Sequence, residues 1–290
     1  MGRLDGKVAL VTGAGGGLGR SHALLLAHEG AAVVVNDLGG SRDGSGASRM
    51  ADEVVNEIIA AGGRAAADYG SVSDETSARN MVQTAVEQFG KLDILINNAG
   101  ILRDKSFKNM THAEWDIVVD VHLRGTYLVA KAAWDTMLEQ GHGGRIINTS
   151  STSGLIGNFG QTNYGAAKAG IAGFTRVLAL EGMKYGITVN TLAPAAFSRM
   201  TEDIMPEGVE QRFAPEKVSP AVVWLCSEEA AKVTGRQFCV TGNRVSLLSW
   251  QVTEIADKDP MDPPWTVQEI GEHIQTSMEQ WPKLLRPMEV

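Results

Sequence analysis

Three residues in the middle of the chain, Ser151, Tyr164 and Lys168, have the types and spacing needed for acid–base chemistry on a hydroxyl group. Tyr164 and Lys168 are four residues apart, so a helix would place both side chains on one face. A phenol has an ordinary pKa of about 10 and becomes a usable base only when a neighbouring cation favours the phenolate. Lys168 would supply that charge, and Ser151 could hold the same substrate oxygen by a hydrogen bond. Taken singly, the three are equally a half-buried tyrosine, a surface lysine and a serine at a strand end.

A glycine-rich turn near the N-terminus suits the binding of phosphate groups. Segment 12–20 reads TGAGGGLGR and lies between a short apolar run and an apolar helical pattern at 21–29. Glycines let the backbone approach a pyrophosphate, and the free N–H groups of a helix N-terminus favour an anion. A tight turn without a ligand is the alternative that composition leaves open. The context favours a dinucleotide site formed by Gly13, Gly16, Gly17, Leu18 and Gly19.

Asp37 follows the second apolar run, eighteen residues after Gly19. A carboxylate there can accept hydrogen bonds from the ribose hydroxyls of adenosine and would repel a 2′-phosphate. No Lys or Arg stands beside it, and the first basic residue is Arg42, in a Gly- and Ser-rich segment at 38–47. These features predict NAD as the cofactor in preference to NADP. An aspartate that only caps the loop is the alternative, and Asn36 could share the cofactor role.

Polar residues end the fourth apolar run, where further apolar residues would be usual. Segment 95–100 reads LINNAG. An asparagine side chain can pair with backbone groups of neighbouring strands, and we expect Asn97 to do mainly this. We expect Asn98, Ala99 and Gly100 to lie against the cofactor.

Short apolar runs alternate with longer helical patterns and define the fold class. The runs at 7–11, 31–36, 92–97, 145–149 and 188–193 indicate buried strands, and 64–67 and 237–241 are further candidates. Between them, apolar residues recur at three- and four-residue spacing, as they do from Ala78 to Phe89. The alternation predicts an α/β protein with a Rossmann-type, doubly wound parallel sheet in a single domain.

The last part of the chain departs from this alternation. Three prolines, at positions 260, 263 and 264, precede an apolar helical stripe made of Val267, Ile270, Ile274, Met278 and Trp281. We therefore expect an NAD-binding domain at 1–242 and a C-terminal extension at 243–290. Its helix is expected to dock on this core or on another subunit.

Composition and charge exclude several classes of function. Of the 290 residues, 43% are hydrophobic and 21% charged, which suits a sizeable core. A net charge of −8, without a basic stripe, argues against nucleic acid as a partner. No apolar run is long enough to span a membrane, and the six histidines and two cysteines lack metal-ligand spacing. Two cysteines, with neither a secretion signal nor a peroxisomal tripeptide, lead us to expect a cytoplasmic protein.

Together the motifs resemble those of the classical short-chain dehydrogenase/reductase family. The family's TGxxxGxG pattern appears at 12–19, its NNAG at 97–100, and its Ser–Tyr–Lys set at 151, 164 and 168. Segments outside the general pattern are similar to the (3R)-hydroxyacyl-CoA dehydrogenase units of peroxisomal multifunctional enzymes of type 2. These segments lie at 35–40, 98–104, 121–125, 157–161 and 198–201. The resemblance covers about residues 1–242 and implies an NAD-dependent enzyme acting on a secondary alcohol as a homodimer or homotetramer.

The resemblance also gives roles to residues that spacing alone does not single out. His122 stands where the family usually has a catalytic Asn that helps to hold a water near the lysine, although a core histidine on an apolar stripe is equally open. Ser71 and Val72 stand where relatives contact adenine, and Pro194 follows the sixth strand beside the cofactor. Lys168 is expected to bind the nicotinamide ribose and, with the oxidised ring, to lower the pKa of Tyr164.

The expected reaction is the oxidation of a (3R)-hydroxyacyl-CoA to the 3-ketoacyl-CoA. The alternatives are a hydroxysteroid or sterol side-chain thioester dehydrogenase, and a 3-oxoacyl reductase running in the opposite direction. A protein that binds NAD without turnover is a further alternative, against which the complete Ser–Tyr–Lys set argues. Arg103, Lys105 and Lys108 could meet CoA phosphates or form a solvated basic patch.

Overall fold

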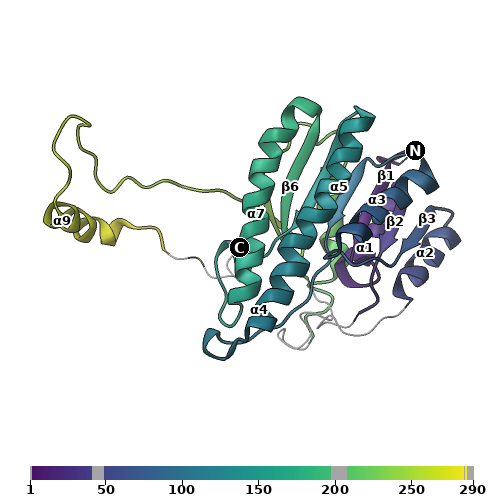
Figure 1. The fold of residues 1–290 in the computed structure, drawn as a ribbon, viewed down its shortest axis with the longest axis horizontal. Coiled ribbons are helices and arrows are strands. Elements are labelled where there is room, and N and C mark those ends of the chain that lie inside the picture. Colours follow the sequence, from purple (N-terminus) through teal and green to yellow (C-terminus); the bar gives the residue numbers. More distant parts are fainter. Residues whose placement is uncertain (1, 41–48, 197–207, 284, 286–290) are drawn as a thin grey trace.

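Eight strands form one central sheet in the part of the chain that the computed structural model describes, residues 2–40, 49–196, 208–283 and 285 (Figure 1). Their order across the sheet is β3-β2-β1-β4-β5-β6-β7-β8, and only β8 runs antiparallel to its neighbour. The strands are β1 (Val8–Thr12), β2 (Ala32–Asn36), β3 (Arg64–Asp68), β4 (Ile94–Asn97), β5 (Gly144–Thr149), β6 (Ile187–Ala195), β7 (Gln237–Thr241) and β8 (Arg244–Leu248).

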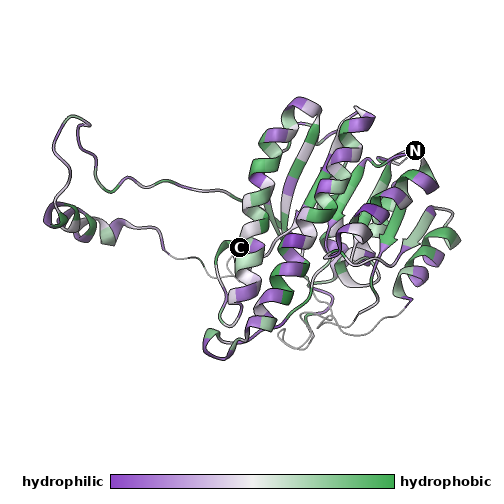
Figure 2. Cartoon of the chain, viewed as in Figure 1, coloured by the Kyte–Doolittle hydropathy of each residue, from purple (hydrophilic) through white to green (hydrophobic). Residues whose placement is uncertain are grey.

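Helices cover both faces of this sheet. One layer contains α1 (Gly17–His28), α2 (Met50–Ala60) and α8 (Ser219–Leu225), and the other contains α3 (Glu75–Phe89), α5 (Gly125–Gln140) and α7 (Thr162–Gly182). Successive strand residues point to opposite faces, so a strand covered on both sides is apolar throughout. The strands are accordingly mostly apolar and the helices two-sided (Figure 2). The predicted Rossmann-type, doubly wound fold is confirmed.

The last strand differs from the expected arrangement. Strand β8 falls within 243–290, the range expected to be the extension, yet it pairs with β7 across a two-residue turn. Gly242 starts that turn at φ +56°, a conformation that glycine adopts readily and that a two-residue hairpin of type II′ needs at its first position. The sheet therefore continues to Leu248 and ends in an antiparallel strand.

The helix that leads towards β5, residues 112–140, is interrupted in the middle. It consists of α4 (His112–Val119), a five-residue π-helical segment (Asp120–Arg124) and α5, without a break in the chain direction. A π turn inserts an extra residue into the helical ladder and is frequent at functional sites. Here it carries His122 into the interior, where the side chain is 1% exposed. The shorter segments are α6 (Thr152–Leu155) and the 3₁₀ turns Phe107–Asn109, Met183–Tyr185, Pro215–Lys217 and Met278–Gln280.

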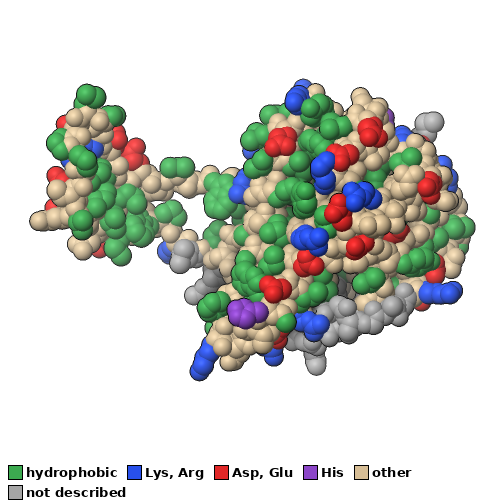
Figure 3. All heavy atoms as spheres, viewed as in Figure 1, with side chains coloured by type: hydrophobic (Ala, Val, Ile, Leu, Met, Phe, Trp, Pro, Cys, Tyr) green, Lys and Arg blue, Asp and Glu red, His purple; other side chains and the backbone are tan. Residues whose placement is uncertain are grey.

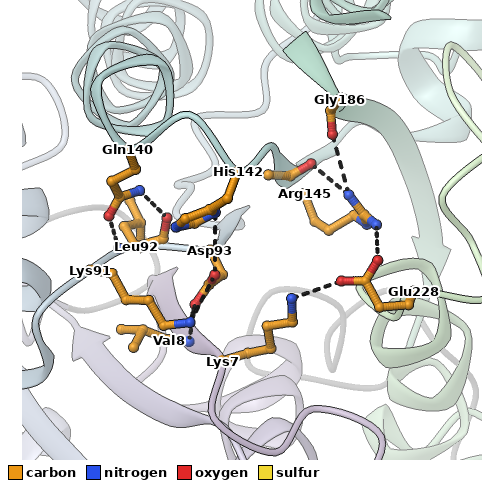
Figure 4. A network of polar contacts seen from close by, with 11 residues as sticks. Lys7, Val8, Lys91, Leu92, Asp93, Gln140, His142, Arg145, Gly186 and Glu228 are labelled. Atoms are coloured by element: carbon orange, nitrogen blue, oxygen red, sulfur yellow. Dashed lines mark hydrogen bonds and ion pairs between the residues drawn. The ribbon is translucent and has the colours of Figure 1, made fainter.

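Charged side chains tie together the amino ends of the strands (Figure 4). Asp93, just before β4, is 5% exposed, and its carboxylate lies 3.0 Å from Lys91 Nζ. Arg145 in β5 lies 3.2 Å from the carboxylate of Glu228, which also accepts a hydrogen bond from Lys7 Nζ at 2.7 Å. Glu228 thus connects the starts of β1 and β5 to the segment after α8, and Asp93 connects β4 to β1 by accepting a hydrogen bond from Val8 N at 2.8 Å. All these contacts lie at the edge opposite the carboxyl ends of the parallel strands.

A buried histidine on α1 makes a testable contribution to acid stability. His22 is fully buried, with Nδ1 2.8 Å from Ser219 Oγ, and burial lowers its pKa to about 3. The unfolded chain, with an ordinary histidine pKa of about 6.5, binds more protons than the folded chain between these two values. The free energy of unfolding therefore falls as the pH drops from 6.5 towards 3, by at most about 1.4 kcal/mol per pH unit from this group.

We expect His22→Gln to flatten the loss of stability between pH 6.5 and 4, because Gln has no proton to gain. Urea unfolding at a series of pH values measures the difference from the wild type. His28→Gln is the matched control, since His28 lies on the same helix with its side chain 80% exposed. Parallel curves for wild type and His22→Gln would contradict the prediction.

The chain beyond β8 leaves the sheet as an arm, residues 249–283. It passes Trp250, whose ring lies 5.4 Å from the Arg176 guanidinium of α7, and ends in α9 (Val267–Ser277), which stands away from the sheet (Figure 1). No residue of α9 is buried, and apolar side chains gather on its surface (Figure 3). Val267 is 89% and Met278 54% exposed. The expected docking of this helix on its own core is therefore not observed.

Candidate active site

The carboxyl ends of the parallel strands bring the expected site residues to one edge of the sheet. The glycine-rich turn follows β1, Asp37 follows β2, Asn98 follows β4, and Ser151 follows β5. The order of the strands reverses between β1 and β4, and such a switch point is where doubly wound sheets bind ligands.

The turn after β1 has room for backbone only. A Cβ at Gly13, whose φ is +62°, would lie 2.7 Å from Ala99 Cα, and one at Gly19 would lie 2.2 Å from the Gly13 carbonyl oxygen. The N-terminus of α1, which begins at Gly17, has neither a capping side chain nor an acidic residue in its first turn. Its first N–H groups therefore have no side-chain acceptor within the helix cap, and a pyrophosphate fits this environment.

The segment after β4 fastens this turn. Thr12 Oγ1 accepts hydrogen bonds from the backbone N–H groups of Asn98 at 3.0 Å and Ala99 at 3.1 Å. In return, Asn98 Nδ2 donates to the carbonyls of Thr12 and Gly13. Asn97 instead donates to Asn148 Oδ1 at 2.9 Å and so joins β4 to β5. Gly100 lies against the imidazole of His122, where a Cβ would be 2.3 Å from Cε1.

Asp37 is held by the backbone on both sides. Its Oδ2 accepts a hydrogen bond from Gly15 N at 2.8 Å, and its Oδ1 accepts one from Gly39 N at 2.7 Å. Each carboxylate oxygen has a second lone pair, so the side chain can still accept from a ribose hydroxyl. Asn36 is occupied differently, because its Nδ2 donates to Asp68 Oδ1 and to the Gly70 carbonyl.

Ser151, Tyr164 and Lys168 converge as their spacing predicts. Tyr164 and Lys168 lie on α7, with Lys168 Nζ 5.5 Å from the centre of the Tyr164 ring. Ser151 caps α6, and its hydroxyl lowers the pKa of the Tyr164 phenol. Lys168 is 3% exposed, and its Nζ donates to the Thr149 carbonyl at 2.6 Å. The serine hydroxyl, the phenol and the ammonium are thus arranged around one point.

The protein's own groups do not prepare Tyr164 as a base. Burial raises the pKa of Tyr164 to about 12, the hydrogen bond from Ser151 opposes that rise, and the negative charge of Asp104 adds to it. Burial also lowers the pKa of Lys168 to about 7, so part of its population is uncharged at neutral pH. The expectation that Lys168 lowers the pKa of Tyr164 is therefore not met by the protein alone. Since a cation favours the phenolate, the positively charged ring of a bound oxidised nicotinamide would lower the pKa of Tyr164.

His122 lies in direct contact with the catalytic candidates. Its ring meets the Tyr164 ring edge-on at a centroid distance of 5.1 Å, and its Nε2 lies 2.8 Å from the Ile101 carbonyl oxygen. Burial, followed by the charge of Lys168, lowers the pKa of His122 well below its ordinary value, which keeps the imidazole neutral. Its Nδ1 is buried without a protein partner, so it can still bind a polar atom in the site.

Three further expected cofactor residues flank this edge. Ser71 and Val72 follow β3, where the Ser71 and Ser73 hydroxyls are 3.0 Å apart and Val72 packs on Gly125 of α5. Pro194 lies near the end of β6, opposite Val240 of β7. Arg42, most of segment 38–47, and segment 198–201 lie outside the described residues.

Sequence reasoning gave no role to several residues that surround Tyr164. Asn163 is fully buried; it accepts a hydrogen bond from Tyr164 N and donates to the carbonyls of Arg103 and Glu114. Gln161 Nε2 donates to Asp104 Oδ2 at 2.7 Å. The sequence feature that could have indicated a role for Asp104 and Gln161 is their place in segments 98–104 and 157–161, which resemble those of the multifunctional enzymes.

Two other kinds of site are absent from the described residues. In residues 2–40, 49–196 and 208–283, no three His, Cys, Asp or Glu side chains lie together as a metal site would require. Within the same ranges, every helix is too short or too polar to cross a bilayer.

Comparison with known proteins agrees with this arrangement. The family model for short chain dehydrogenase matches residues 7–207. Peroxisomal multifunctional enzyme type 2 of the mouse is 51% identical over 252 residues, which cover 87% of this chain but only 34% of the mouse protein.

Solved structures give the same result. A short chain dehydrogenase from Mycobacterium avium matches with a TM-score of 0.86 and 46% identity over 98% of each chain. A short chain dehydrogenase from Mycobacterium paratuberculosis bound to NAD matches with a TM-score of 0.75 and 29% identity, covering 83% of this chain and 98% of that one. The chain belongs to the short-chain dehydrogenase family.

Proposed function

We propose that this oxidoreductase uses NAD to oxidise the C3 hydroxyl of (3R)-hydroxyacyl-CoA thioesters. The observation that carries the proposal is the meeting of Ser151, Tyr164 and Lys168 beside a glycine turn suited to a dinucleotide. A protein that only binds NAD would not need a phenol, a hydroxyl donor and a buried ammonium around one point.

Each of these side chains has a defined task. NAD, when bound, accepts the hydride from the substrate carbon. Tyr164 Oη takes the proton of the substrate hydroxyl, and Ser151 Oγ holds the same oxygen so that the carbon is correctly oriented. Lys168 binds the nicotinamide ribose, and the positive charge of the oxidised nicotinamide ring, when bound, would favour the phenolate of Tyr164. His122 Nδ1 holds a water molecule beside Lys168, through which the proton can leave.

The preference for NAD rests on Asp37. Its carboxylate is fixed by two backbone hydrogen bonds and would repel the 2′-phosphate of NADP. Support comes from the NAD-bound mycobacterial structure. Ser71 and Val72 would contact the adenine, and the backbone of Asn98, Ala99, Gly100 and Pro194 would lie along the rest of the cofactor.

The substrate class rests on the relatives. The mouse protein is a peroxisomal multifunctional enzyme, and a further relative, 42% identical over 259 residues, is named a hydroxyacyl-CoA dehydrogenase. A hydroxysteroid or sterol side-chain thioester, and reduction of a 3-oxoacyl group, remain the alternative reactions at the same residues. A 30% identical structure of a 7α-hydroxysteroid dehydrogenase with NADH favours the steroid as second candidate.

Initial rates with NAD and NADP test the proposal on three kinds of substrate, namely (3R)-hydroxyacyl-CoAs, (3S)-hydroxyacyl-CoAs and hydroxysteroids. We expect the highest kcat/KM for a (3R)-hydroxyacyl-CoA with NAD. Activity on hydroxysteroids alone would favour the second candidate, and higher kcat/KM with NADP would overturn the role of Asp37. Absence of turnover with every alcohol would leave only cofactor binding.

The arm has a proposed role in assembly. We infer a dehydrogenase domain followed by an extension, joined in a homodimer or homotetramer in which α9 packs on another subunit. The exposed apolar face of α9 supports this, because an isolated helix of eleven residues is marginally stable in water. The two buried free cysteines support a cytoplasmic location.

Removing residues 249–290 is expected to lower the oligomeric state or weaken the assembly, since the apolar contact of α9 would be lost. Light scattering over a concentration series measures the mass of the intact and shortened chains. Identical masses at all concentrations would rule out the assembly role of the arm.

A further inference from the structure

The loop after β4 and the segment that leads into α7 meet beside Tyr164. Lys105 N donates to the Gly160 carbonyl at 2.9 Å, and Lys105 pairs with Gln161 as an isolated parallel bridge. The loop after β4 therefore lies along the segment that leads into α7. Asp104 and Gln161 lie in these two segments, and neither residue belongs to the cofactor turn or to the Ser–Tyr–Lys set.

The side chain of Gln161 connects them. It is 6% exposed, and its Nε2 donates to Asp104 Oδ2 at 2.7 Å. Its Oε1 accepts hydrogen bonds from Ser153 Oγ at 2.7 Å and from Asn158 Nδ2 at 3.1 Å. An ionised carboxylate only accepts hydrogen bonds, so Asp104 fixes which end of the amide faces it and which end faces Ser153.

The same contacts reach both oxygen-bearing catalytic residues. Ser153 N donates to Ser151 Oγ at 3.1 Å, so the residue that contacts Gln161 also fixes the Ser151 hydroxyl. The Gln161 carbonyl accepts from Gly165 N at 2.7 Å in the first turn of α7, which carries Tyr164. One buried amide thus joins the start of α6, the start of α7 and the loop after β4.

We propose that Gln161 is a positioning residue that sets the distance between Ser151 and Tyr164, with Asp104 holding the Gln161 amide in its working orientation. This inference rests on the proposed function, in which both hydroxyls meet one substrate oxygen. A displacement of either hydroxyl by about 1 Å lowers the rate by up to about 100-fold without touching the cofactor site. The effect should therefore fall on kcat, with KM for NAD unchanged.

Asp104 has a second, electrostatic effect on Tyr164. The charged or titratable groups facing this phenol are Lys168 on α7, His122 on the π turn and Asp104 in the loop. The negative charge of Asp104 raises the pKa of Tyr164, in addition to the larger effect of burial. Replacing Asp104 by Asn removes this charge but keeps an oxygen that can accept from Gln161, so the pKa of Tyr164 should fall.

Exchanging the two polar groups tests the positioning role. Gln161→Glu places two carboxylates in contact, and we expect kcat at the optimal pH to fall by about 10- to 100-fold. In the double variant Asp104→Asn/Gln161→Glu, the new amide donates to the new carboxylate, while Ser153 and Asn158 keep their acceptor. The double variant should therefore recover most of the lost kcat, which damage to folding alone would not allow.

Gln83→Glu is the matched control, because Gln83 also donates to a carboxylate, that of Glu87, but on the exposed surface of α3. Its kcat should equal that of the wild type. The proposal is overturned if Gln161→Glu keeps the wild-type kcat, or if the double variant is as slow as Gln161→Glu.

A spectroscopic titration separates this inference from the proposed function. The absorbance difference between a protein and its Tyr164→Phe counterpart, followed against pH without substrate, reports the phenolate of Tyr164. Asp104→Asn should shift that titration to lower pH, and an unshifted curve would overturn the effect of Asp104. Because the titration requires no turnover, a wild type that oxidises none of the alcohols would refute the proposed function alone.

Discussion

Replacing Tyr164 by Phe is expected to lower kcat for alcohol oxidation by about 10²- to 10⁴-fold, the range over which a positioned proton acceptor acts. The phenylalanine ring fills the same space beside His122 and below Lys168 Nζ, so α7 should remain folded. What disappears is the phenol oxygen that we propose as the acceptor of the substrate proton. Initial rates of NADH formation measure the loss.

Cofactor binding and thermal stability should be almost unchanged in this variant. Calorimetric titration with NAD and the Tm show whether they are. Tyr127→Phe is the control, because Tyr127 lies on α5 with 49% exposure and keeps its ring against Phe174. If Tyr164→Phe retains more than about a tenth of the wild-type kcat, the loss of rate is smaller than a general base contributes. Tyr164 would then not be the base.

Replacing Asp37 by Asn is expected to raise kcat/KM with NADP by about 10- to 100-fold, equivalent to roughly 1.4 to 2.8 kcal/mol of removed repulsion. The same change should weaken NAD binding. Asp37 accepts hydrogen bonds from both Gly15 N and Gly39 N, whereas the amide of Asn offers only one accepting oxygen. One backbone N–H would lose its partner, and the turn after β1 would be less firmly held.

Initial rates with both cofactors at several concentrations give the ratio of the two kcat/KM values. Asp135→Asn removes the same charge from the exposed surface of α5, where it pairs with Lys131, and should leave the ratio unchanged. An Asp37→Asn protein with the wild-type ratio would mean that Asp37 serves the loop and not the choice of cofactor.

The sequence predicts the fold and the proximity of Tyr164 to Lys168 because both depend on short-range patterns. Strands buried on both faces are continuously apolar, so β1 and β2 are visible as the runs at 7–11 and 31–36. Tyr164 and Lys168 must share a face of any helix that contains them. The glycine turn is equally local, since a Cβ at Gly19 would collide with a carbonyl only six residues away in sequence.

What the sequence does not predict depends on distant contacts. Gln161 contacts Asp104 across 57 residues, and no spacing rule connects an amide to a carboxylate that far away. The π turn at His122 depends on how α4 and α5 fit the interior, where Ile101 supplies the partner of the imidazole. The pKa of Tyr164 depends on burial, which overrides the influence assigned to Lys168 from its position four residues away.

The ion pairs at the amino ends of β1, β4 and β5 have a consequence for how proteins of this kind diversify. They anchor the sheet at one edge, while the candidate reacting groups lie at the other. Loops at the reactive edge can therefore accumulate mutations during evolution without loosening that anchor. A common ancestor with such a sheet could give rise to lineages acting on different alcohols, each of which keeps the same ion pairs at the amino ends of the strands.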